Sequence, residues 1–142
     1  GDGPMLQEIK EEIIEKKLER IVKIHQGVSD EEMFGMYSRA DIFLLPILYD
    51  KVDKEGFGIV FLEAANFSVP VISTDMPGID EAVENNETGL LVPDGNTDEL
   101  VVALTKLISS PEERLQLGTA ARKRVRDRFS CKVQFAKLEM YV

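Results

Sequence analysis

The sequence predicts an α/β fold built on a doubly wound parallel sheet, and three observations support this prediction. Short apolar segments alternate with longer segments of helical periodicity, an order typical of strands connected by helices. Residues 41–46 contain an unbroken apolar run, which is typical of a strand buried on both faces of a parallel sheet. The chain has 142 residues of which 44% are apolar, enough for the core of one domain.

The first third of the chain is expected to hold two helices with a short strand between them. Pro4 occupies a first helical position, and an apolar stripe at four-residue spacing continues that helix to about residue 18. Residues 21–24 are apolar enough for a strand. Asp30 begins the second helix, whose apolar face is formed by Met33, Met36, Tyr37 and Ala40.

The middle of the chain predicts three strands and two helices. The strand at 41–46 is followed by a long polar loop and by a helix over residues 58–67. A second strand at 70–74 leads to a short helix at 78–84, and the last strand covers 89–92.

Helices fill the remainder of the sequence. Asn96 and Glu99 have the spacing of a capping box ahead of an apolar stripe. The pair Ser110-Pro111 ends that helix, and a further apolar stripe predicts a helix through residue 129. A final helix is expected over residues 132–142.

Composition and charge exclude several classes of function. The net charge of −9 argues against nucleic acid as a partner, because its binders carry basic patches. The single cysteine, Cys131, excludes an intrachain disulfide and fits a reducing compartment, so we expect a cytoplasmic protein. No apolar run approaches the roughly 20 residues of a membrane span. Peripheral contact of the intact protein with the cytoplasmic membrane face is compatible with these data.

The segment between Glu55 and Glu63 carries the strongest functional signal. It places a glycine-containing turn between a buried strand and the start of an apolar helix. The first N–H groups of a helix have no internal acceptor, and the helix dipole adds partial positive charge there, so such a turn can bind an anion. Gly56 and Gly58 lack a Cβ, which lets a ligand approach the backbone.

This segment resembles the E-x7-E motif of retaining glycosyltransferases with the two-domain GT-B architecture, the large family 4 (group 1). Other segments match the family in order and spacing: 1–4, 28–32, 36–41, 69–74, 87–92 and 122–130. The resemblance implies the donor-binding half of an enzyme that transfers a sugar from a nucleotide diphosphate sugar to an acceptor hydroxyl. It implies no cofactor and no metal, and Asp75, Asp80 and Glu81 form no convincing set of metal ligands.

The resemblance also assigns roles to individual residues. Glu63 matches the acid that binds the ribose hydroxyls; otherwise it is a surface glutamate. Glu55 matches the acid beside the donor sugar, a catalytic position; otherwise it is a solvated loop acid. Val28 matches a position in the base pocket, and a core valine explains it equally well. Phe57, Gly58, Ile59 and Val60 are expected to bind the donor through their backbone N–H groups, and Gly56 is expected to contribute to donor binding by letting the ligand approach the backbone.

Members of this family carry a strand, a helix and a second strand ahead of the matching segment, and before those an acceptor-binding domain. We therefore expect residues 1–142 to be a partial donor-binding domain that lacks the first two strands and is inactive in isolation. The family's strand order is 3-2-1-4-5-6. In this numbering residues 21–24 are strand 3, and residues 41–46, 70–74 and 89–92 are strands 4, 5 and 6. Strand 3 would then pair with strand 4, which gives the order 3-4-5-6. Alternatively, the open edge of the sheet would associate with another chain.

Two other functions fit the sequence less well. A GT-B nucleotide-sugar epimerase would use the same nucleotide site without an acceptor, but the motif spacing and the strand that follows match transferases better. A non-catalytic receiver-type module needs an acidic pair after its first strand, a phosphorylatable aspartate and a later lysine, and this set cannot be placed in the sequence.

Overall fold

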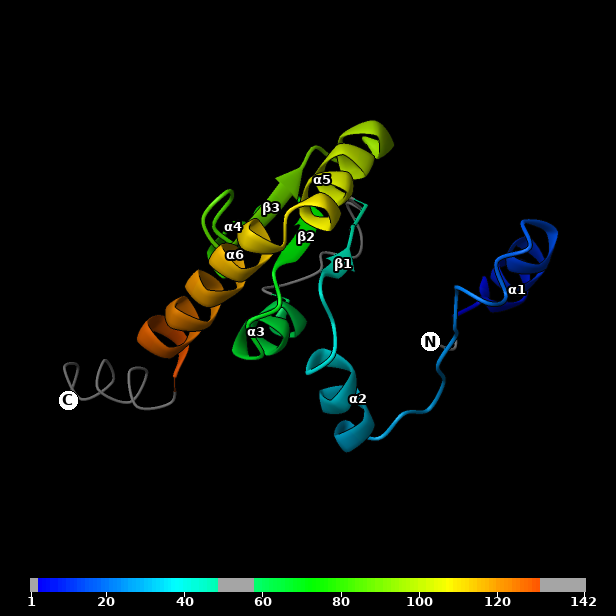
Figure 1. The fold of residues 1–142 in the computed structure, drawn as a ribbon, viewed down its shortest axis with the longest axis horizontal. Helices are drawn as coiled ribbons and strands as arrows, with labels where there is room; N and C mark the ends of the chain where they lie inside the picture. Colours follow the sequence, from blue (N-terminus) through cyan, green and yellow to red (C-terminus); the bar gives the residue numbers. More distant parts are fainter. Residues whose placement is uncertain (1–2, 49–57, 131–142) are drawn as a thin grey trace. The chain divides into compact units, whose positions relative to one another are not determined.

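The computed structural model describes residues 3–48 and 58–130 of the chain. It divides into two compact units, residues 1–36 and residues 37–142. The first unit contains helix α1 (Leu6–Glu15) and most of helix α2 (Asp30–Tyr37), and the second unit contains the sheet and the remaining helices (Figure 1).

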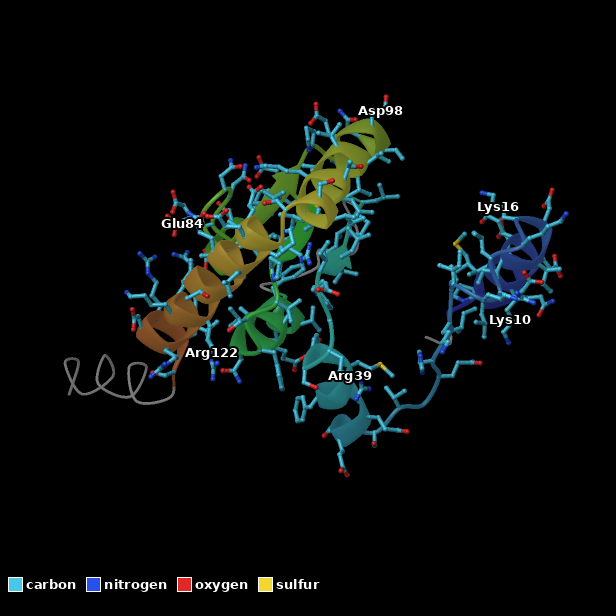
Figure 2. All side chains as sticks on the ribbon, viewed as in Figure 1. Lys10, Lys16, Arg39, Glu84, Asp98 and Arg122 are labelled. Atoms are coloured by element: carbon cyan, nitrogen blue, oxygen red, sulfur yellow. The ribbon has the colours of Figure 1, made fainter. Side chains whose placement is uncertain are left out.

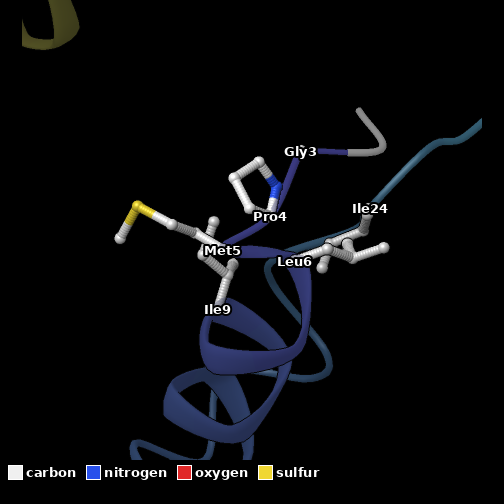
Figure 3. Close-up of a pocket in the computed structure, with 6 residues that line it drawn as sticks. All are labelled: Gly3, Pro4, Met5, Leu6, Ile9 and Ile24. Atoms are coloured by element: carbon white, nitrogen blue, oxygen red, sulfur yellow. The ribbon is translucent and has the colours of Figure 1, made fainter.

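Helix α1 confirms the first predicted helix over a shorter range. Its C-terminus is closed by Lys17 in a left-handed conformation (φ 56°), and the N–H of Leu18 donates to the carbonyl of Ile13 at 2.9 Å. Apolar residues at the start of the helix and Ile24 line a hollow of about 340 Å³ (Figure 3). Most of this lining is apolar.

The prediction of a strand at residues 21–24 is wrong, because the structure has no strand there. The N–H groups of Ile21 and Val22 both donate to the carbonyl of Leu18, at 2.9 and 2.8 Å, which makes a turn. The side chain of Ile21 is 78% exposed. A strand is stable only when its backbone is paired, and here local turn bonds take the donors instead. The expected order 3-4-5-6 is therefore wrong as well, while association of the sheet edge with another chain stays a prediction.

Helix α2 begins with a reciprocal cap. The N–H of Glu32 donates to Oγ of Ser29 at 3.2 Å, and the N–H of Ser29 donates to Oε2 of Glu32 at 2.8 Å. This arrangement satisfies two N–H groups at the helix start. The predicted start of the helix at Asp30 is confirmed.

The described part of the second unit contains a parallel sheet in the order β1-β2-β3. Its strands are β1 (Phe43–Leu45), β2 (Val71–Thr74) and β3 (Gly89–Val92), each within or equal to its predicted range. The middle strand is paired on both sides, with Ile72 opposite Leu44 and Leu90. Every residue of β2 is buried, as expected for the centre of a parallel sheet.

In the described part of this unit, five helical segments accompany the sheet, and α3 to α6 are labelled in Figure 1. They are α3 (Ile59–Asn66), α4 (Ile79–Ala82), α5 (Thr97–Ser109), α6 (Pro111–Arg124) and the π-helical turn η1 (Val125–Phe129). Helices α5 and α6 pack on the sheet, and the core between them consists of Ile72, Leu90, Val92, Ala103, Leu107 and Leu117. Charged side chains such as Asp98 on α5 and Arg122 on α6 lie on the outside (Figure 2). The alternation of strands and helices confirms the α/β prediction.

Specific side chains set the helix ends. Oδ1 of Asn96 accepts from the N–H of Glu99 at 3.1 Å, which confirms the predicted cap. Oγ of Ser110 accepts from the N–H of Glu113 at 3.2 Å, so the Ser110-Pro111 break is confirmed and starts α6. The carbonyls of Leu107 and Ile108 lie in the last turn of α5 and receive no N–H from that helix. The guanidinium of Arg114 donates to both of them. The helix expected at 132–142 lies outside the described residues.

Helix α6 approaches the end of α3 closely at a glycine. A Cβ on Gly118 of α6 would lie 1.9 Å from the carbonyl oxygen of Ser68, which follows α3. Ser68 itself has φ 62°, a conformation that favours glycine. The backbone contact between α3 and α6 therefore depends on the missing side chain at position 118.

Replacing Gly118 with alanine tests this contact. We expect Gly118→Ala to lower the free energy of unfolding by about 1–3 kcal/mol, the usual range for overpacking. Alanine inside a helix otherwise gains about 1 kcal/mol over glycine, so propensity alone predicts the opposite sign. Urea unfolding measures the difference. Gln116→Ala, at an exposed position of the same helix, should change stability by less than about 0.5 kcal/mol; equal effects of the two substitutions would contradict the packing argument.

Candidate functional site

The start of α3 follows the carboxyl end of β1 in the chain, which is the edge where α/β sheets bind ligands. Gly58 is the residue before the helix and has φ 67° and ψ 68°, a left-handed conformation. The N–H of Phe61 donates back to the carbonyl of Gly58 at 3.0 Å. The N–H groups of Ile59 and Val60 precede this bond, so the helix itself gives them no acceptor. The sequence predicts that these two N–H groups bind an anion, and that role stays a prediction.

Position 58 requires glycine for two reasons. Its backbone angle is one that side chains disfavour. In addition, a Cβ would lie 2.5 Å from two ring carbons of Phe61, which is 1% exposed and cannot move aside freely. The ring of Phe61 packs edge-on against Phe43 of β1, with centroids 6.1 Å apart. The turn that begins α3 is therefore fixed to the first strand through two aromatic rings.

Glu63 projects from the same helix and has a specific partner. The hydroxyl of Tyr37 donates to Oε2 of Glu63 at 3.2 Å, and Glu63 is partly buried. Burial, together with the charge of Glu63 and the hydrogen bond to it, raises the pKa of Tyr37 to about 12. Tyr37 thus remains a protonated donor at physiological pH. The bond explains how a carboxylate is accommodated inside an apolar segment of helix.

Two hydroxyls of β2 hold the chain at the end of β1. Oγ of Ser73 donates to the carbonyl of Leu45 at 2.7 Å. The N–H of Ile47 donates to Oγ1 of Thr74 at 3.0 Å. Both side chains are buried, at 0% and 2% exposure. These bonds fix the direction in which the chain leaves the sheet toward the predicted site.

The structure places the predicted site residues in three groups. Gly58, Ile59, Val60 and Glu63 come together on the first turns of α3. Val28 belongs to the first unit, and its side chain is 38% exposed. This exposure disfavours the alternative that Val28 is a core residue of that unit. The remaining predicted residues lie outside the described part of the chain: Glu55, Gly56 and Phe57.

Sequence reasoning missed three residues that support this site: Tyr37, Ser73 and Thr74. Each is a polar side chain inside an apolar segment, and a buried hydroxyl needs a hydrogen-bond partner. That signal was present in the sequence, but it does not name the partner.

The described residues, 3–48 and 58–130, show no metal-binding cluster and no membrane-spanning helix. In this part of the chain, no group of three or more His, Cys, Asp or Glu side chains is arranged to hold a metal ion. Asp80 instead accepts a local hydrogen bond from the N–H of Gly78 at 2.9 Å. None of the described helices has the length and apolar character needed to cross a bilayer.

Comparison with known proteins identifies the family. Residues 1–124 match the family described as glycosyl transferases group 1. The chain belongs to this family.

Its relatives are named as glycosyltransferases. The GDP-mannose-dependent alpha-(1-6)-phosphatidylinositol monomannoside mannosyltransferase of Mycobacterium tuberculosis is 31% identical over 140 residues, 97% of this chain and 36% of that protein. The capsular polysaccharide biosynthesis glycosyltransferase CapM of Staphylococcus aureus is 36% identical over 118 residues, 83% of this chain and 29% of that protein. The chain thus spans about a third of the length of the relatives it matches.

Solved glycosyltransferase structures have the same fold. Sucrose-phosphate synthase from Thermosynechococcus elongatus superposes with a TM-score of 0.81 at 28% identity, covering 99% of this chain and 35% of that one. Anabaena HepE in complex with UDP-glucose gives a TM-score of 0.78 at 23% identity, covering 100% of this chain and 38% of that one. These matches confirm the predicted GT-B fold class.

The glycine that begins α3 can be tested against a matched position. Gly58 and Gly95 both have φ 67°, but only a side chain at Gly58 would meet another group. Gly95→Ala should lower the free energy of unfolding by about 1–2 kcal/mol, the cost of a left-handed alanine. Gly58→Ala should cost about 1–3 kcal/mol more, because Phe61 must shift. Urea unfolding of both variants measures the difference, and equal losses would show that Phe61 does not restrict position 58.

Proposed function

We propose that this chain is the donor-binding part of a retaining glycosyltransferase that moves a sugar from a nucleotide diphosphate sugar to an acceptor hydroxyl. The observation that carries the proposal is the start of α3, where the donors of Ile59 and Val60 and the carboxylate of Glu63 occupy one helix after a left-handed Gly58. Family membership and the named activities of the relatives support it.

The diphosphate is assigned to the N-terminus of α3. The unpaired N–H groups and the positive end of the helix dipole favour an anion at this point. This mode of binding needs no net positive charge, so it is compatible with a chain of net charge −9. We propose that no metal ion takes part, with the phosphate charge balanced by backbone donors and by basic groups elsewhere in the whole protein.

The two acids of the E-x7-E motif take the two ends of the donor. Glu63 accepts from the ribose hydroxyls, since one carboxylate can accept from two vicinal hydroxyls. Glu55 lies on the sugar side and is the proposed catalytic carboxylate, an assignment that rests on its spacing from Glu63. Val28 is proposed for the base pocket. Titration of the chain with UDP and GDP in turn separates the base preferences.

Retention of configuration follows if the outgoing phosphate oxygen deprotonates the acceptor on the same face of the sugar. The protein then contributes mainly by positioning the reactants and stabilising charge. The acceptor is proposed to bind to parts of the whole protein outside this chain. The named activities of the relatives favour transfer over the epimerase alternative, and family membership favours it over a receiver-type module.

The setting of the whole protein is also a proposal. We propose a cytoplasmic enzyme that contacts the membrane face peripherally when its acceptor is a lipid. The name of the Mycobacterium tuberculosis relative, which includes phosphatidylinositol monomannoside, supports a lipid acceptor as one choice within the family.

Substitution of the two acids tests the donor site in the intact protein. Glu63→Gln should weaken binding of both a nucleoside diphosphate and its sugar conjugate by about 10- to 100-fold, because a hydrogen bond to a charged group is lost. Glu55→Gln should weaken the sugar conjugate alone. Calorimetric titration with UDP, GDP and ADP and their glucose or mannose conjugates measures both effects.

Glu87→Gln is the control, because Glu87 is an exposed loop acid in the same unit. It should leave every affinity unchanged. Normal binding of both ligands by folded Glu63→Gln and Glu55→Gln variants would remove the assignment of the site.

A further inference from the structure

The hydroxyl of Tyr37 is the feature of the site that the proposed function does not use. It belongs to the last residue of α2 and donates to Oε2 of Glu63, across 26 residues of sequence. The side chain of Tyr37 is 7% exposed. A hydroxyl with so little access to water needs a protein partner, and the carboxylate of Glu63 supplies it.

The ring of Tyr37 is held on two sides by elements that form the site. It lies 5.7 Å from the ring of Phe43 in β1, tilted by 47°. It stacks on Phe67 at the end of α3, at 5.8 Å and with 21° between the planes. The strand that leads to the site and the helix that carries Glu63 therefore both fix the position of the hydroxyl.

A fixed donor restricts the carboxylate that accepts from it. The terminal torsion of a glutamate is broad when nothing binds it, so a free Glu63 would present its oxygens in many directions. The bond from Tyr37 occupies one acceptor position on Oε2 and restricts the rotation of the carboxylate. Oε1 and the remaining lone pair of Oε2 are left as acceptors for a ligand.

We propose that Tyr37 is a positioning residue, which orients the Glu63 carboxylate toward the ribose diol of the nucleotide and so makes the site selective for ribose. The inference rests on the proposed role of Glu63 in binding ribose. It adds to that role a requirement for orientation, since a carboxylate accepts well from two vicinal hydroxyls only in a limited range of rotations.

A purely structural role for Tyr37 makes a different prediction. If the hydroxyl only satisfied its own burial, its removal would change stability and would affect all ligands alike. If it orients Glu63, its removal affects only ligands that carry the ribose hydroxyls. The affinity ratio between a ribonucleotide and its analogue without those hydroxyls separates the two roles.

The test uses Tyr37→Phe in the intact protein, because phenylalanine keeps the ring contacts and removes one oxygen. The probes are UDP, GDP and ADP, and for the one that binds most tightly its 2′,3′-dideoxy counterpart. The variant should bind the ribonucleotide about 3- to 10-fold more weakly, the effect of one hydrogen bond. Its affinity for the dideoxy analogue should change by less than 2-fold, judged against the same single-bond scale. An unchanged ratio between the two ligands would overturn the inference.

Matched variants separate packing from orientation. Leu107→Ala weakens the core beneath α5 without touching Tyr37 or its aromatic contacts, so it should lower the urea midpoint while preserving the affinity ratio. Tyr37→Phe combined with Glu63→Gln should bind no more weakly than Glu63→Gln alone, because the two residues act through one carboxylate. Additive losses in the double variant would contradict the inference.

Failure of the inference is distinguishable from failure of the proposed function. If Glu63→Gln leaves the affinity ratio unchanged, the assignment of Glu63 to ribose is wrong. If Glu63→Gln lowers the ratio and Tyr37→Phe does not, only the role of Tyr37 is wrong. Should Tyr37→Phe fail to fold, Glu63→Asp takes its place, because the shorter side chain keeps the negative charge but moves the carboxylate away from the hydroxyl of Tyr37. This variant should lower the affinity ratio between the ribonucleotide and its dideoxy analogue. A preserved ratio would overturn the inference.

Discussion

Burial of the central strand β2 is the constraint on which the rest of the structure depends. All of its residues are buried, and its backbone pairs with β1 on one side and β3 on the other. Ile72 contributes to the core beneath α5 and α6, while Ser73 and Thr74 direct their hydroxyls to the end of β1. One short strand thus sets both the hydrophobic core and the direction of the chain as it leaves the sheet toward α3.

The proposed chemistry relies on position more than on reactive side chains. The N–H groups of Ile59 and Val60 at the start of α3 have no acceptor within the helix itself. Glu63 is accommodated in an apolar helix because Tyr37 donates to it. A donor bound here would meet fixed dipoles and an oriented carboxylate, which cost little reorganisation on binding. The same aromatic contacts that stabilise the fold therefore prepare the site.

The sequence predicted features that depend on neighbours in the chain. The last strand at 89–92, the cap at Asn96 and the helix break at Ser110-Pro111 were predicted correctly, since their signals are local. The strand at 21–24 was wrong because an apolar run becomes a strand only when a partner strand is available. The bond between Tyr37 and Glu63 was missed because it joins distant residues, and only tertiary packing brings them within reach. The same limit applies to Val28, whose predicted place in a base pocket would depend on contacts that no local pattern encodes.

A crystal structure of the intact protein with a bound nucleoside diphosphate tests the central claim most directly. The account predicts phosphate oxygens within hydrogen-bond distance of the N–H groups of Ile59 and Val60, about 2.7–3.2 Å. It also predicts the ribose hydroxyls on the carboxylate of Glu63, with the bond from Tyr37 retained. A nucleotide bound elsewhere, with the start of α3 facing solvent, would contradict the assignment of this turn as the donor site.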